Sequence, residues 1–107
     1  MLNPLKGDVF VTINVERDFE LVTLEVTGRL DTTTAPNLES VINELSDDTK
    51  ELVFNMSGVE YISSAGIRVL LSAYKKMNSN QGKIRIEKVN DMVSEIFEMT
   101  GLSELLE

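Results

Sequence analysis

Two adjacent serines, Ser63 and Ser64, stand in the stretch YISSAGIRVLL, between an apolar strand and an apolar helix. A helix has unsatisfied N–H groups in its first turn, and serine is among the residues that best accept hydrogen bonds from them. The same N–H groups and the positive end of the helix dipole also favour a bound phosphate. The stretch therefore has two interpretations, a serine that only caps a helix and a serine that carries a phosphoryl group.

Two residue types that build many catalytic sites are absent from the sequence. The chain contains no His and no Cys, which excludes a Ser-His-Asp triad, a cysteine nucleophile and a zinc site of the usual kind. It has neither a GxxxxGK nor a GxGxxG phosphate loop. Acidic residues are scattered, and Asp47 and Asp48 are expected in solvent at a helix exit. We therefore predict a protein that is not an enzyme and that uses no cofactor and no metal.

The charge and length limit the possible partners. The 107 residues carry 18 acidic and 10 basic side chains, a net charge of −8, which disfavours nucleic acid and anionic membranes. The charge suits a partner with basic patches, but solubility alone also explains it. No segment resembles a signal peptide or reaches the roughly 20 apolar residues of a membrane span. We expect a single domain over residues 1–107, in the cytoplasm, with no nucleic-acid partner and no membrane insertion.

Two segments at the start of the chain, in each of which apolar residues recur at every second position, predict an antiparallel hairpin. The strands are expected over residues 8–16 and 21–28, and Gly28 is expected to break the second strand. A short connection of this length is typical of antiparallel neighbours. The predicted inward positions are Val9, Val11, Ile13, Val15, Val22, Leu24 and Val26.

Three helices alternate with two further strands in the rest of the chain. The first helix is expected after an N-cap at Thr34, with Pro36 in its first turn, and ends at SDDTKE. The consecutive apolar residues of LVFNM, 52–56, predict a central strand, followed by a loop, SGVEYISSAG, that leads into the second helix. A fourth strand is expected over 83–89, after Gly82.

The third helix is expected to start near Asn90 and Asp91, with Gly101 just past its end. Residues 102–107 then form a short closing turn or helix. The predicted buried positions after the hairpin are Leu38, Val41, Ile42, Leu45, Ile67, Leu70, Leu71, Tyr74, Ile84, Ile86, Val93, Ile96 and Phe97.

The element order ββαβαβα predicts an α/β fold. We expect a mixed, mostly parallel sheet of four to five strands, with the N-terminal antiparallel hairpin and three to four helices. Ser63 and Ser64 then follow the central strand, at the carboxyl ends of the parallel strands, where ligands and functional loops gather. A phosphate there adds about −1.5 to −2 charges and can act as a binary switch.

Three stretches, in this order, resemble the signatures of the anti-sigma factor antagonists, the stand-alone STAS domains of bacteria. They are GRLDTTTAP, LVFNMSGVEYISSAGIRVLLSAYKKM and IFEMTGLSELL, and the resemblance covers roughly residues 8–107. It implies a STAS-like fold and a protein that binds an anti-sigma factor, itself a Ser/Thr kinase with a histidine-kinase-like ATPase fold. Binding frees a sigma factor for RNA polymerase. The kinase phosphorylates one serine at the start of the second helix, which dissociates the complex, and a metal-dependent phosphatase restores the active form.

The resemblance also assigns site residues. The phosphorylated serine of the family corresponds to Ser64, directly before the Ala-Gly pair, and Asn55 corresponds to a polar residue at a strand end that shapes the same site. The first loop of the family, which is acidic and lies near the docking face, corresponds to Asp31 and the threonines after it. The residues implied to bind the partner are Asp31, Thr32, Thr33, Asn55, Ser63, Ser64, Ala65, Gly66 and Arg68.

The sequence departs from the family at Ser63, because many members carry Asp directly before the phosphorylated serine. Ser63 is left as a competing phosphate acceptor or as a neutral cap. Arg68, four residues after Ser64, either pairs with a phosphate at that spacing or is a solvated helix residue.

The same fold serves two other functions. Stand-alone STAS domains also act as accessory subunits of lipid-transporting ABC systems, and some STAS domains are proposed to bind nucleotides. A serine at the switch position favours the antagonist over the transporter subunit, and the absence of His and of lysine-rich phosphate clamps disfavours nucleotide binding.

Overall fold

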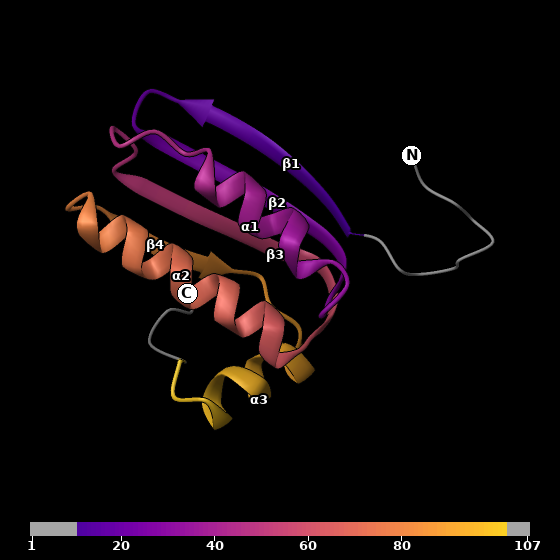
Figure 1. Ribbon diagram of the computed structural model, residues 1–107. Coiled ribbons are helices and arrows are strands. Elements are labelled where there is room, and N and C mark those ends of the chain that lie inside the picture. Colours follow the sequence, from indigo (N-terminus) through magenta and orange to yellow (C-terminus); the bar gives the residue numbers. More distant parts are fainter. Residues whose placement is uncertain (1–10, 103–107) are drawn as a thin grey trace.

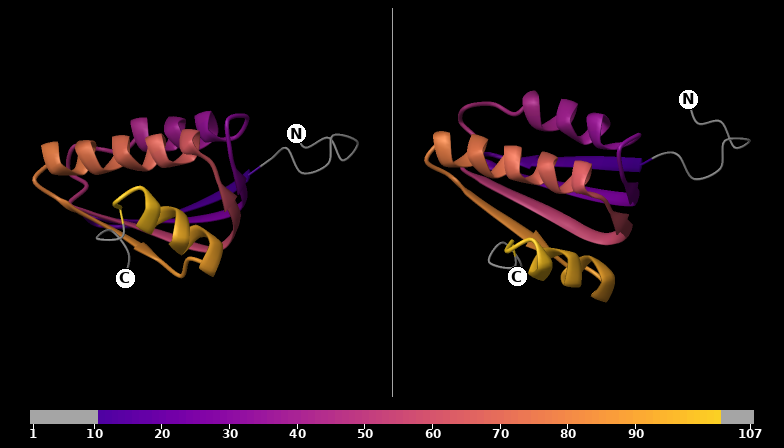
Figure 2. Two further views of the ribbon diagram at one scale, coloured as in Figure 1. Left: turned by 90° about the horizontal axis from the view of Figure 1, so that it is seen from below. Right: turned by 60° about the horizontal axis from the view of Figure 1, so that its bottom comes forward.

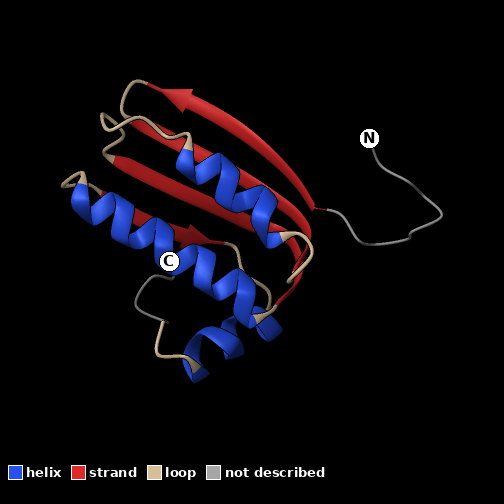
Figure 3. Cartoon of the chain, viewed as in Figure 1, coloured by secondary structure: helices blue, strands red, loops and turns tan. Residues whose placement is uncertain are grey.

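A computed structural model describes residues 11–102 of the chain (Figure 1). In these residues four strands and three helices follow one another in the predicted order, ββαβαβα (Figure 3). The predicted position Val9 and the closing turn or helix after Leu102 lie outside the described residues. The elements are β1 Val11–Asp18, β2 Leu21–Leu30, α1 Ala35–Asn43, β3 Glu51–Ile62, α2 Ser64–Ser79, β4 Lys83–Glu87 and α3 Asp91–Met99.

The strands form one mixed sheet in the order β1-β2-β3-β4. β1 and β2 pair antiparallel, whereas β2–β3 and β3–β4 pair parallel. α1 and α2 lie side by side on one face of the sheet, and α3 stands apart from them and packs against β3 (Figure 2). The predicted fold class is confirmed.

The core lies between the sheet and the helix pair. The predicted inward residues of β2, Val22, Leu24 and Val26, are all buried. In β3, Val53 and Phe54 are both buried although successive strand residues point to opposite faces. Both faces of β3 are therefore covered at this point, as predicted for a central strand.

Two strands are longer than predicted. β2 continues through Gly28, whose φ of +112° suits glycine, and pairs there with both neighbouring strands. β3 runs on to Ile62 through the stretch expected to be a loop. Against β2, β3 advances three residues from Asn55 to Gly58 while β2 advances two, so one residue of β3 bulges. A second extra residue follows Val59. These bulges break the alternation of faces, so the sequence lacks a strand pattern here.

Three predictions of buried positions are wrong. Leu71 and Tyr74 of α2 are exposed, because the face that the helix buries runs through Gly66, Leu70, Ala73 and Met77 and the two residues lie beside it. Val15 is 38% exposed because it lies on β1, which is the edge strand of the sheet.

The remaining predicted positions from residue 11 onward are buried or half-buried, including Leu45, which follows the end of α1.

The predicted ends of α3 are confirmed. The Asn90 Oδ1 accepts a hydrogen bond from the Val93 N–H at 2.8 Å. At the other end Gly101 has a φ of +77°, and the Leu102 N–H donates to the Phe97 carbonyl at 2.8 Å, which is a Schellman arrangement. No helix within residues 11–102 is long and apolar enough to cross a membrane.

Candidate functional site: a surface at the carboxyl ends of β2 and β3

The two serines lie at the junction of β3 and α2 and have different surroundings. Ser63 is the N-cap residue, with an extended backbone, and its Oγ accepts from the Gly66 N–H at 3.5 Å. Ser64 is the first residue of the helix and is exposed. The cap is therefore Ser63, and the hydroxyl of Ser64 is open to solvent.

The start of α2 is fixed against the end of β2. The Ser63 N–H donates to the Leu30 carbonyl at 2.9 Å. A Cβ added at Gly66 would lie 2.7 Å from Ile62 Cγ1 and 2.9 Å from the same Leu30 carbonyl oxygen. Glycine therefore allows the first turn of α2 to approach the strand end, and this contact determines where Ser64 is displayed.

The turn after β2 is organised by Asp31. Its Oδ1 accepts from the N–H groups of Thr33 and Thr34 at 3.0 and 3.2 Å. The buried Thr34 hydroxyl donates to the Arg29 carbonyl at 2.6 Å and accepts from the Asp31 N–H at 2.9 Å. Thr34 thus occupies the predicted N-cap position of α1 but makes no side-chain capping bond, because its hydroxyl faces back to β2. Thr32 and Thr33 remain exposed at the tip.

Two residues that were not predicted border this surface. Arg29 and Tyr61 are cross-strand partners of β2 and β3, and the guanidinium carbon lies 4.5 Å from the centre of the Tyr61 ring. The Arg29 Nε is 3.9 Å from Asp31 Oδ2. The sequence contains no signal for this pair, because Arg29 and Tyr61 come into register only after both bulges of β3.

Of the remaining predicted site residues, Ala65 and Arg68 lie near Ser64, whereas Asn55 lies far from it. Arg68 lies one turn after Ser64 on α2 and is exposed, whereas Ala65 is half-buried beside Ser64. Asn55 is not at a strand end, since β3 continues for seven more residues, to Ile62. Its Oδ1 accepts from the Ser57 N–H at 3.0 Å, at the first bulge. The structure therefore separates Asn55 from the other predicted site residues.

Comparison with known proteins identifies the family. The model of the STAS domain matches residues 12–107 of the chain. The chain belongs to the STAS domain family. The resemblance based on the three sequence stretches is thereby confirmed, and so is the STAS-like fold.

Proteins that are similar to this STAS domain in sequence or structure include anti-sigma factor antagonists. The anti-sigma-B factor antagonist of Staphylococcus aureus is 33% identical over 84 residues, which cover 78% of each chain. The crystal structure of an anti-sigma factor antagonist from Mycobacterium paratuberculosis superposes with a TM-score of 0.77 at 28% identity, covering 90% of this chain and 82% of that one. The phosphorylated form of SpoIIAA from Bacillus has a TM-score of 0.74 at 15% identity, over 90% and 89% of the chains, and shares the fold.

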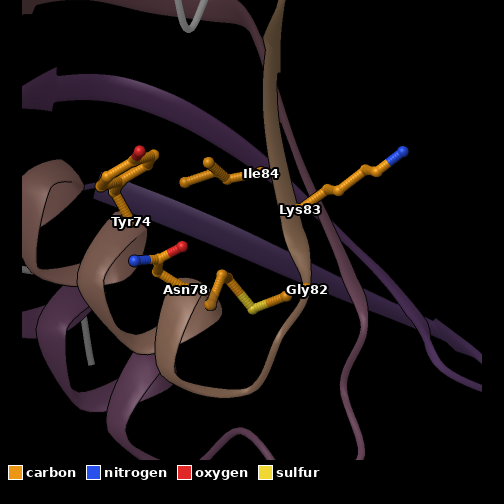
Figure 4. Close-up of a pocket in the computed structure, with 6 residues that line it drawn as sticks. Tyr74, Asn78, Gly82, Lys83 and Ile84 are labelled. Atoms are coloured by element: carbon orange, nitrogen blue, oxygen red, sulfur yellow. The ribbon is translucent and has the colours of Figure 1, made fainter.

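Two hollows of this STAS domain lie away from the serines. One, of about 280 Å³, lies at the start of β4, and the Tyr74 and Ile84 side chains face each other across it (Figure 4). The other, of about 630 Å³, lies beside the β1–β2 turn and includes Phe19. Both are at the amino ends of the parallel strands and contain none of the predicted site residues.

The described residues also contain no group of three His, Cys, Asp or Glu side chains that could hold a metal ion. The candidate site is therefore an exposed surface at the strand ends rather than a pocket.

Proposed function

We propose that this STAS domain is an anti-sigma factor antagonist that is switched off by phosphorylation of Ser64. Its docking surface is formed by Asp31, Thr32, Thr33, Ser63, Ser64, Ala65, Gly66 and Arg68, at the carboxyl ends of β2 and β3. The surface binds an anti-sigma Ser/Thr kinase with a histidine-kinase-like ATPase fold, and binding releases a sigma factor in the cytoplasm. The names of the relatives from Staphylococcus aureus and Mycobacterium paratuberculosis support this role.

The proposal rests on the difference between the two serines in the structure. Ser63 caps α2, so Ser64 is not needed to terminate the helix and its hydroxyl is exposed. A kinase can reach this hydroxyl, and transfer of the γ-phosphoryl group of ATP to Ser64 Oγ leaves the cap intact. The phosphate is then close to the free N–H groups and the positive dipole end of α2, which favour it.

Phosphorylation dissociates the complex with the kinase through the charge and the volume of the added phosphate. It places about −1.5 to −2 charges in the middle of the docking surface, where the partner fits only the neutral hydroxyl. Arg68, one turn further along α2, pairs with the new phosphate at the i,i+4 spacing and holds it on the surface. A metal-dependent phosphatase removes the phosphate and restores binding. SpoIIAA, with the same fold, has been solved in a phosphorylated form, so the fold accommodates such a group.

The proposal is tested with paired variants of the purified protein. Ser64→Ala and Ser64→Asp serve as baits for a lysate of the source organism, and retained proteins are identified by mass spectrometry. Ser79→Ala is the control, because Ser79 is exposed at the other end of α2 and outside the docking surface. We expect Ser64→Ala and Ser79→Ala to retain a histidine-kinase-like ATPase and Ser64→Asp to lose it. Incubation of the wild-type protein with that kinase and ATP should then modify Ser64.

Other outcomes of the same experiment contradict the switch. Equal retention of one partner by Ser64→Ala and Ser64→Asp would show that the Ser64 hydroxyl is not the control point. Retention of a transporter ATPase by all three baits would instead support the accessory subunit of a lipid-transporting ABC system.

A further inference from the structure

The Arg29–Tyr61 pair presents a fixed cation on an acidic protein. The guanidinium lies over the Tyr61 ring at 4.5 Å, a distance at which cation and ring attract each other. The Arg29 side chain is nevertheless 41% exposed. Stacking on a ring holds the long side chain in place, so less conformational freedom remains to be lost when a partner binds.

The hydrogen-bonding capacity of the Arg29 guanidinium is largely unused within residues 11–102. Its one ion pair there, with Asp31 Oδ2, is 3.9 Å long, and the other oxygen of Asp31 is occupied by the N–H groups of Thr33 and Thr34. A guanidinium has five N–H donors in a planar fork that matches a carboxylate in a bidentate manner. Arg29 can therefore accept a further anionic partner without breaking a hydrogen bond of its own.

The pair lies next to Ser64, across the end of the sheet. Arg29 directly precedes Leu30, whose carbonyl accepts from the Ser63 N–H, and Tyr61 is two residues before Ser63. The spacing of residues and strands in a sheet puts the Arg29 and Ser64 backbones roughly 10 Å apart. Leu30 is buried against the helices, so Arg29, its neighbour along the strand, points to the opposite face of the sheet. The Arg29 Nε nevertheless lies 3.9 Å from Oδ2 of Asp31, in the turn after β2. A partner whose contact extends from Ser64 over Asp31 and around the strand end therefore reaches Arg29.

We propose that Arg29, supported by Tyr61, recognises a carboxylate on the anti-sigma kinase and thereby determines which kinase this chain binds. The inference rests on the proposed function and adds the chemistry of the partner. Arginine and tyrosine are enriched among the residues that contribute most to protein–protein affinity. The opposite signs of Arg29 and of the partner carboxylate attract, whereas the chain as a whole, with a net charge of −8, repels a carboxylate.

The test uses unphosphorylated protein and the purified kinase retained by the Ser64→Ala bait. Dissociation constants are measured by titration calorimetry for the wild type, Arg29→Gln, Arg29→Lys and Tyr61→Leu. Arg17→Gln is the matched control. Arg17 is an exposed cation of β1 that pairs with Val22, near the start of β2, and so lies at the opposite end of the sheet from Ser64. Circular dichroism and thermal unfolding verify that each variant is folded. Because no phosphate is present, an effect at Arg29 reports a group of the kinase and not phosphoserine 64.

We expect Arg29→Gln to weaken binding about tenfold or more, as loss of an interface hot spot does. Arg29→Lys keeps the charge but loses the planar fork, and Tyr61→Leu keeps the charge but loses the support, so both should fall between Arg29→Gln and the wild type. Arg17→Gln should stay within about twofold of the wild type. Replacing the matching carboxylate of the kinase by lysine should be compensated by Arg29→Glu, which a merely structural role of Arg29 would not produce.

The outcomes separate this inference from the proposed function. If the wild-type protein binds no kinase, the proposed function is wrong and the inference fails with it. If the wild type binds and Arg29→Gln binds within about twofold of it, the inference alone is overturned. A folded Arg29→Lys variant that behaves as the wild type would also overturn the assignment of a bidentate carboxylate.

Discussion

At the scale of single residues, Ser63 and Ser64 are neighbours with different roles. Ser63 Oγ accepts from the Gly66 N–H, whereas Ser64 is exposed at the first position of α2. We therefore expect Ser63→Ala to lower the free energy of unfolding by about 1 kcal/mol. Ser64→Ala should change it by less than about 0.5 kcal/mol, as exposed positions do. Urea denaturation of both variants measures this difference, and a larger loss at Ser64 would contradict the assignment of the cap.

The resemblance assigned the phosphorylated position to Ser64, with Ser63 as the alternative, but the sequence could not decide which of the two serines caps α2. The choice depends on the residue at which α2 begins, which is determined by the contact of Gly66 with Leu30 and Ile62 rather than by local preference. Arg29 and Tyr61 were not predicted at all, because their register follows from two bulges that leave no periodic pattern. Whether Ser64 is phosphorylated stays a prediction.

Phe19 carries local strain that a substitution can relieve. It has a φ of +57° and is fully exposed at the β1–β2 turn. A left-handed backbone costs an ordinary residue about 1–2 kcal/mol, but asparagine adopts it more readily. Phe19→Asn should therefore raise the free energy of unfolding by about 1 kcal/mol, whereas Phe19→Tyr, with the same backbone preference, should leave it unchanged. Urea denaturation distinguishes them, and a loss of stability in Phe19→Asn would show that the ring makes a compensating contact.

At the scale of elements, the attachment of α2 to β2 can be tested at Gly66. In an exposed helix, Gly→Ala stabilises by about 1 kcal/mol. At Gly66 the new Cβ would meet Ile62 Cγ1 at 2.7 Å and the Leu30 carbonyl oxygen at 2.9 Å. We expect Gly66→Ala to destabilise the protein by about 1–3 kcal/mol instead.

Ser72→Ala on the exposed face of α2 serves as the control for Gly66→Ala and should have little effect. Thermal unfolding of both variants decides the sign. A more stable Gly66→Ala variant would mean that the helix moves away from the strand without cost.

The order and type of the elements could be predicted from the sequence, but several of their limits could not. Alternation gave the inward residues of β2, and helical spacing gave the buried positions of α1 and α3. Gly28 was expected to end β2, yet pairing with both neighbours keeps it in the sheet. Leu71 and Tyr74 were expected to be buried because of their hydrophobicity, but the buried face of α2 also contains Gly66 and Ala73, small residues that were not counted as core positions.

At the scale of the whole molecule, one core joins the sheet to the helix pair. Phe54, from the central strand, is fully buried in this core, whereas Leu71 is 36% exposed on α2. Phe54→Ala should lower the free energy of unfolding by about 3–5 kcal/mol. Leu71→Ala should lower it by about 1 kcal/mol or less.

Urea denaturation followed by circular dichroism measures both losses. A single transition is expected in each case, because the described elements share this core. Similar losses for Phe54→Ala and Leu71→Ala would contradict the placement of the core on the inner side of β3.

The two ends of the sheet offer an experimental advantage. Phe19 lies two residues before the start of β2, and the ten residues of that strand separate it by about 30 Å from the end that displays Ser64. The chain contains no cysteine, so Phe19→Cys creates a unique thiol at the tip of the turn. A fluorophore or a surface linker attached there leaves the docking surface facing the solution, which allows association and release of the kinase to be followed on single, oriented molecules.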